Sequence, residues 1–226
     1  MSLASEEVRK FIDRVQVAGN YHRELLSAVH LKTHQASLET MLSEQFVFNM
    51  VVYWEVFVSD LLLSYLVMSP AQYRKTLREK IQASIKDRYG SAASRTISFR
   101  NETRLSLAQA AALVDPKDFN ISVISADNLA KRANEILAAK YAKSFTLDPD
   151  DRQFVDFLIS IRNYLAHRSQ GSRTALRSAV TSLRGINSDL SGNITNVGTY
   201  LKAKNAADET RALVIARRLE ELALKL

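Results

Sequence analysis

Apolar and polar residues follow one another along most of the chain with the spacing of α-helices. An apolar stripe that includes Phe11 and Val15 predicts a first helix over about residues 5–34. Gly19 and Asn20 weaken the pattern in its middle, and apolar residues then resume the same spacing.

A longer apolar pattern predicts a second helix over about residues 36–68. This helix is expected to end just before Ser69 and Pro70, because proline disfavours the helical conformation of the residue that precedes it. A basic helix over about residues 71–88 follows and is expected to stop at Gly90.

The middle of the chain has a less regular pattern. An alanine-rich segment over about residues 102–114 predicts another helix. Ser125 or Asp127 is a suitable N-cap for a helix that reaches about Tyr141.

The clearest helix start in the sequence is at Asp148. Its carboxylate can accept hydrogen bonds from free amides, Pro149 suits the first helical position, and Asp150 and Asp151 complement the helix dipole. We expect this helix to continue to about Arg168. A short helix to about residue 184 and a final amphipathic helix over about residues 199–224 complete the pattern.

Composition agrees with a helical protein. The 226 residues include only three prolines and six glycines, which are few for a turn-rich β architecture. A chain of this length can fill one core. The predicted fold is therefore an all-α helical bundle with a long central apolar helix and additional peripheral helices. We expect residues 1–226 to form a single domain, in which about residues 70–147 could be an elaboration between core helices.

The apolar segment over residues 46–68 has the length of a membrane span, but its polar residues favour a buried central helix. Glu55 and Asp60 would be costly near the centre of a bilayer. The chain begins without the basic and apolar regions of a signal peptide. It contains no cysteine, which excludes disulfides and thiolate zinc sites. We expect a cytoplasmic protein with no membrane partner.

The net charge of +7 suggests an acidic partner or substrate. From residue 162 to the C-terminus, eleven Arg or Lys residues stand against five Asp or Glu residues. The excess positive charge therefore lies at and after one helix end. A set of solvated basic helix faces is the alternative explanation.

That helix end carries the candidate chemistry, in Arg162, Asn163 and His167. Asn163 and His167 are four residues apart, so they are neighbours on the helix surface, and Asp156 shares their side. Arg162 lies on the flank. Opposite them is an apolar stripe, formed by Phe154, Leu158, Ile161 and Leu165. His167 is therefore expected on an outer face, either in a cleft or as an ordinary solvent-facing histidine near a helix C-terminus.

The sequence Arg162-Asn163-x-x-x-His167 resembles the hallmark of the HEPN superfamily, in which Arg, a polar residue and then His follow one another late in a helical bundle. The apolar helix with the internal acid Glu55 also looks like a helix of that family. The resemblance implies metal-independent RNA cleavage in a cleft between paired subunits. Ser169 departs from the Tyr that some toxin members carry two residues after the His.

The residue types suit that reaction by themselves. A histidine can act as base or acid near neutral pH, and the guanidinium of Arg162 offers fixed donors to a phosphate on which negative charge builds. Asn163 could orient His167 or bind a phosphate oxygen. No acidic cluster has the spacing of metal ligands, so we expect neither a metal nor a cofactor.

The candidate residues outside the Arg162–His167 cluster allow more than one interpretation. Glu55 is expected inside the bundle, either as a buried acid bonded to an arginine or a helix end, or as a support for Arg162. The basic residues that follow the cluster are expected to be solvated but could track an RNA backbone; they are Arg168, Arg173 and Arg177. Asp156 is a second candidate support.

Three functions are compatible with this sequence. The first is a HEPN-like endoribonuclease of a bacterial toxin, defence or stress system, which acts as a homodimer on RNA and has an inhibitor or antitoxin protein as a further partner. The second keeps the fold without the reaction, as an RNA- or nucleotide-binding module or a scaffold subunit. The third is a basic helical protein that binds DNA or another protein.

Overall fold

A computed structural model describes residues 2–99, 104–114 and 124–226. Over these ranges the chain is helical without a β-strand, which confirms the all-α bundle. Its elements are α1 (Leu3–Val29), α2 (Gln35–Met68), α3 (Ala71–Thr96), α4 (Leu107–Val114), α5 (Ala126–Ile136), α6 (Ala139–Ala142), the 3₁₀-helix η1 (Lys143–Phe145), α7 (Pro149–His167), α8 (Gln170–Ser182), α9 (Val197–Lys202) and α10 (Arg211–Ala223).

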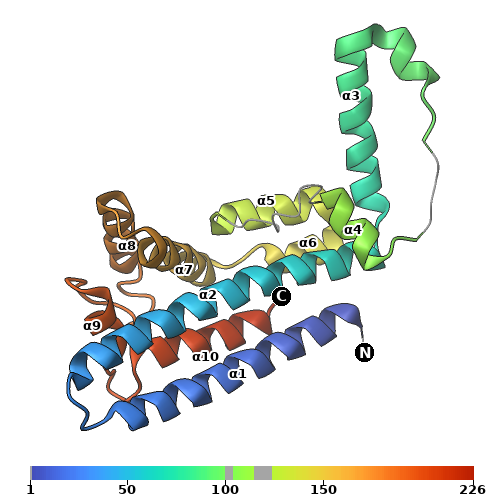
Figure 1. Cartoon of the computed structure of the whole chain (residues 1–226). Coiled ribbons are helices and arrows are strands. Elements are labelled where there is room, and N and C mark those ends of the chain that lie inside the picture. The colour runs from blue at the N-terminus through green and yellow to red at the C-terminus, as the bar shows by residue number, and fades with distance from the viewer. Residues whose placement is uncertain (1, 100–103, 115–123) are drawn as a thin grey trace.

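The long helix α2 forms the centre of the bundle (Figure 1). It packs against α1 and α10 and against α7, so the two predicted central helices do lie together. Met50, Trp54 and Leu61 of α2 are buried in the core. By length and composition α2 could cross a membrane, but 56% of its most apolar window is buried inside the structure.

Two predicted helix ends in this bundle were wrong. The first helix ends at Val29 instead of near residue 34, because Leu31 and His34 adopt left-handed backbone conformations with φ of 63° and 65°. The helix predicted to reach Tyr141 ends at Ile136, since Leu137 has an extended backbone, and α6 then begins.

The predicted C-terminal helix over residues 199–224 is two helices. Asn205 causes part of this break, because its side-chain oxygen accepts hydrogen bonds from the backbone N–H groups of Ala207 and Glu209. Thr210 then caps α10 by accepting the N–H of Leu213.

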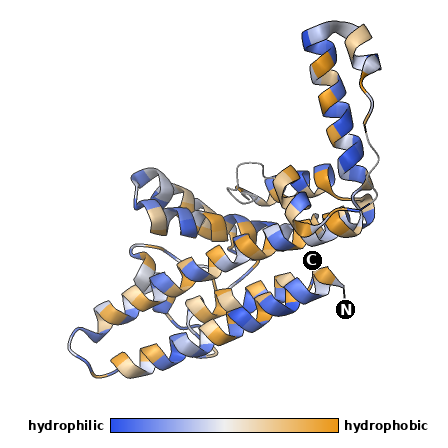
Figure 2. Cartoon of the chain, turned by 45° about the vertical axis from the view of Figure 1, so that its right-hand side comes forward, coloured by the Kyte–Doolittle hydropathy of each residue, from blue (hydrophilic) through white to orange (hydrophobic). Residues whose placement is uncertain are grey.

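Helix α3 projects away from the bundle (Figure 1), and none of its residues is buried. Figure 2 shows hydrophilic residues interspersed with hydrophobic ones along its length. Gly90, with φ of 85°, interrupts it at the predicted stop, and a further helical segment continues to Thr96. Residues 102 and 103 of the predicted alanine-rich helix lie outside the described ranges, and the helical part begins at Leu107.

Helix α7 carries the candidate site, and both its start and its core face match the prediction. The Asp148 carboxylate accepts the N–H of Asp151 at 2.8 Å. Asp151 is itself buried, with its carboxylate 2.7 Å from Arg218 and 2.5 Å from Lys225. This network fixes the start of α7 to the C-terminal end of α10. The buried side of α7 contains Phe154, Phe157, Leu158 and Ile161, with Leu165 partly buried.

Candidate functional site

The side chain of Arg162 is held between two polar neighbours. Its Nη2 lies 3.7 Å from Oε2 of Glu55 on α2, and its Nη1 donates a hydrogen bond to Oδ1 of Asn163 at 3.2 Å. The Nε atom is buried and has no hydrogen-bond partner in the described part of the chain. An unpartnered donor of this kind is uncommon in proteins and is a reason to look for a functional role.

Glu55 is the acid that the apolar helix α2 directs towards α7. Its side chain is 27% exposed, and burial raises its pKa, while the charge of Arg162 acts in the opposite direction. Of the two structural partners considered for Glu55, an arginine or a helix end, the structure shows the arginine. The carboxylate thus limits where the Arg162 guanidinium can go, which is compatible with a supporting role.

A second ion pair joins the same two helices and was missed from the sequence. Arg168 donates two hydrogen bonds to the carboxylate of Glu44 on α2, at 3.2 and 2.6 Å. Glu44 and Glu55 are eleven residues apart, close to three full helical turns, so both face α7. That interval between two acids is the sequence signal that could have revealed the pair.

His167 occupies the last turn of α7 and is exposed to solvent. It makes no hydrogen bond or ion pair with any residue that the structure describes. Asn163, one turn earlier, is half-buried. The imidazole is therefore accessible to a ligand, while the neighbouring guanidinium is restrained by the fold.

Asp156 lies on the predicted side of α7 but has a different partner from the one expected. It shares a side of α7 with Asn163, but its Oδ1 accepts the backbone N–H of Ala126 at 2.8 Å. The carboxylate therefore satisfies the first turn of α5 and does not contact Arg162. Asp156 is a structural residue that connects two helices.

The arginines predicted to follow an RNA backbone also have partners within the protein. Arg168 binds Glu44, as described above. Arg173 donates to the carbonyl of Thr195 at 2.7 Å, and Arg177 donates to the carbonyl of Ile194 at 3.3 Å. These two side chains hold the segment before α9 against α8, although Arg177 is exposed and Arg173 is only half-buried.

No group of three or more His, Asp or Glu side chains with the geometry of a metal site occurs among the described residues. The groups that the prediction joined at the candidate site are the guanidinium of Arg162, the carboxylate of Glu55 and the imidazole of His167. What they offer chemically is phosphate binding and proton transfer.

His22 is a further histidine that sequence reasoning missed. It is buried in α1, stacked on Phe46 with ring centroids 4.3 Å apart. Burial and the charge of Arg23 lower its pKa to about 4. Sequence alone does not mark His22 as a buried residue, because its neighbours along the chain are polar.

Comparison with known proteins adds no assignment. No family model, no curated protein and no solved structure matches this chain. The resemblance to the HEPN superfamily therefore remains a prediction from Arg162, Asn163 and His167.

Proposed function

We propose that the protein is a metal-independent endoribonuclease with Arg162 and His167 at its active site. One observation carries this proposal: a guanidinium restrained by Glu55 and Asn163 lies within a turn and a half of an exposed histidine that has no described partner. A restrained cation and an accessible imidazole supply the phosphate binding and the proton transfer that phosphate-ester cleavage uses.

The proposed reaction begins when the His167 imidazole removes the proton from a ribose 2′-hydroxyl. The 2′-oxygen attacks the adjacent phosphorus, and the bond to the 5′-oxygen of the next nucleotide breaks. That oxygen takes up a proton, which leaves a 2′,3′-cyclic phosphate and a 5′-hydroxyl. A second His167, from another copy of the chain, is the proposed proton donor, because one histidine does not readily act as base and acid in the same step.

Arg162 has the role of stabilising the phosphate as negative charge builds on it. Glu55 restricts the guanidinium so that little motion is needed when the substrate arrives. Asn163 accepts a bond from Arg162 through Oδ1, which leaves its amide N–H groups to contact a phosphate oxygen or the imidazole of His167.

The experiment is incubation of the protein with total cellular RNA in EDTA. We expect the wild-type protein to cleave and His167→Ala to be slower by about 10²-fold or more, because the proton-transfer group is lost. Arg162→Ala should be comparably slow, and Asn163→Ala should be less affected. His30→Ala is the matched control, since His30 is exposed in the turn between α1 and α2.

Product analysis separates this proposal from the others. Cyclic-phosphate ends are expected, and cleavage that depends on Mg²⁺ would contradict the mechanism. Unchanged cleavage by a folded His167→Ala variant would falsify the assignment.

A second candidate function is RNA binding or a scaffold role on the same fold. The observation that favours the scaffold role is that Arg168, Arg173 and Arg177 all bind protein groups, which leaves fewer free cations to contact RNA phosphates. RNA binding without cleavage by the wild-type protein would support this function over the first.

A further inference from the structure

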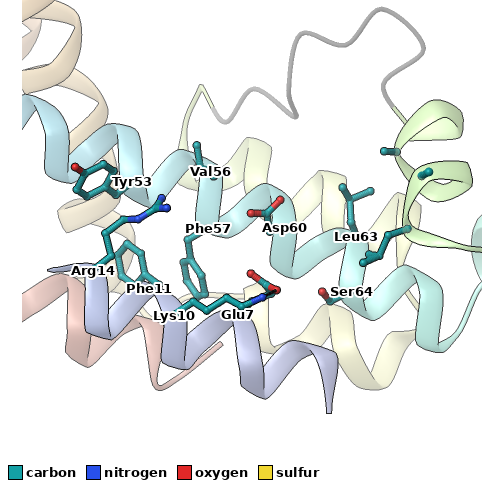
Figure 3. A pocket seen from close by; sticks show the side chains of 13 residues that line it. Glu7, Lys10, Phe11, Arg14, Tyr53, Val56, Phe57, Asp60, Leu63 and Ser64 are labelled. Atoms are coloured by element: carbon teal, nitrogen blue, oxygen red, sulfur yellow. Dashed lines mark hydrogen bonds and ion pairs between the residues drawn. The ribbon is translucent and has the colours of Figure 1, made fainter. Parts of the chain in front are cut away.

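A cavity of about 530 Å³ opens between α1, α2 and α4, on a different side of α2 from Glu55 (Figure 3). Phe11 and Phe57 form its floor; both are buried, and their rings stack with centroids 4.5 Å apart. Leu63 and Leu107 contribute apolar walls. The volume is within the range of small-molecule sites, and the apolar floor with a few polar groups is typical of them.

Four charged side chains line the opening, and two of them neutralise each other. The Nζ atom of Lys10 lies 2.9 Å from the carboxylate of Glu7, and 3.0 Å from that of Glu6 outside the cavity. The other two are Arg14 and Asp60.

Arg14 and Asp60 lack an opposite charge of their own. The guanidinium of Arg14 lies over the ring of Tyr53, 5.0 Å from its centroid, and contacts no carboxylate of the described chain. Asp60 makes no hydrogen bond or ion pair with any described residue. Figure 3 shows the two side chains at the same opening, with Phe57 between them. The opening therefore presents one positive and one negative group that do not satisfy each other.

We propose that this cavity binds a free α-amino acid with an apolar side chain. Its ammonium group would bind Asp60, its carboxylate would bind Arg14, and its side chain would lie on Phe11 and Phe57. The charge pattern favours such a ligand, because Arg14 and Asp60 are both exposed at the opening and only a molecule that carries both charges can form a charge-assisted hydrogen bond with each of them. This site is independent of the proposed ribonuclease activity.

Asp60 is exposed to solvent, and its electrostatics are compatible with binding of a ligand cation. Burial raises the pKa of its carboxyl, and the nearby charge of Glu7 raises it further, while Lys10 and Arg14 lower it. The two cations are thus near enough to act on the carboxylate but not to pair with it. A ligand ammonium in contact with Asp60 would pair with it directly.

Titration calorimetry on the full chain tests the site with L-phenylalanine and L-leucine as probes. Two analogues isolate the two charges: N-acetyl-L-phenylalanine lacks the ammonium, and L-phenylalaninamide lacks the carboxylate. We expect both analogues to bind at least about 10-fold more weakly than L-phenylalanine, since each loses a charge-assisted hydrogen bond.

Two pairs of variants assign the contacts. Asp60→Asn and Arg14→Leu should each weaken L-phenylalanine binding by about 10-fold or more. Asp13→Asn and Arg9→Leu are the matched controls, because Asp13 and Arg9 form an exposed pair on α1 outside the cavity and should leave binding unchanged. Circular dichroism of each variant checks that the fold is retained.

Failure of both amino acids to bind at millimolar concentration would overturn the proposal. Binding that survives Asp60→Asn, or equal binding of the N-acetyl analogue, would also overturn it. Inorganic phosphate is the last probe: if it binds through Arg14 while the amino acids do not, the cavity is an anion site instead.

Discussion

At the scale of single residues, His22 makes the stability of the fold depend on pH. Its ring lies flat on Phe46, and its Nε2 atom is buried without a hydrogen-bond partner in the described structure. Its pKa is lowered to about 4, whereas a histidine in an unfolded chain has a pKa near 6.5. The unfolded chain therefore binds more protons between these values. The contribution of His22 to stability is complete above about pH 6.5 and is lost as the pH falls towards 4.

We predict that His22→Phe will flatten the pH dependence of stability. Between pH 7 and pH 4.5 the wild-type protein should lose about 2–3 kcal/mol more unfolding free energy than the variant, because only the wild type has this group to protonate. Urea unfolding at pH 7, 5.5 and 4.5, followed by tryptophan fluorescence, measures the difference. His30→Ala, at an exposed histidine, should behave as the wild type. If the unfolding free energies of His22→Phe and the wild type fall equally as the pH is lowered, protonation of His22 is not the cause.

Glu55 and Glu44 allow a matched comparison of two ion pairs between the same helices. If RNA is cleaved as proposed, Glu55→Gln should lower kcat by about 10-fold with little change in KM, because Arg162 loses its restraint while RNA binding elsewhere persists. Glu44→Gln removes the partner of Arg168 and should leave kcat near the wild-type value. Steady-state cleavage of one defined RNA distinguishes these outcomes, and an equal loss in both variants would show that general α2–α7 packing is responsible.

At the scale of elements, α7 is held in place at its first turn. Asp151 is buried there and paired with Arg218 and Lys225. Asp151→Ala is expected to lower the free energy of unfolding by about 3 kcal/mol, because Arg218 and Lys225 lose their buried partner and keep only the more exposed carboxylates of Glu221 and Asp148. Asp150→Ala is the control, since Asp150 is exposed and adjacent. Urea unfolding measures both, and a loss below 1 kcal/mol for Asp151→Ala would contradict this view of the network.

The two helices that carry the candidate site could be predicted because the sequence marks their ends. Pro70 follows the end of α2, and Asp148 with Pro149 begins α7. The end of α1 could not, because Leu31 and His34 turn the chain with left-handed backbones where no glycine stands. That conformation is uncommon for such residues, so their identity did not suggest a turn.

The candidate site could be predicted only in part. Glu55 was expected to need a partner, because an acid on an apolar helix rarely remains unpaired. Its pairing with Arg162, and that of Glu44 with Arg168, depends on how α2 and α7 cross. Asp156 shows the same limit: its side of α7 followed from helical geometry, but the covering of that side by α5 is a tertiary contact.

At the scale of the whole molecule, we predict a two-fold dimer in which both copies of the Asn163–His167 surface face one cleft. The exposure of His167 permits this arrangement, and the proposed reaction requires a second proton-transfer group. Sedimentation at micromolar concentration should give the mass of a dimer. Adding excess His167→Ala protein to the wild type should lower activity through mixed dimers, and a fully active monomer would exclude the arrangement.

The lack of buried residues in α3 affects how the stability of this protein has to be read. Among the described residues, the contacts of α3 with the rest of the bundle are surface ones such as the Lys80–Glu135 ion pair at 3.5 Å, whereas most helical stability in proteins comes from the packing of an apolar face. Trp54, the one tryptophan in the chain, lies buried at the centre of the bundle. Fluorescence therefore follows the cooperative melting of the core, while amide exchange along α3 reports local opening at a much smaller free energy. A helix signal averaged over the chain contains both the melting of the core and the opening of α3. Its midpoint therefore measures the stability of neither part.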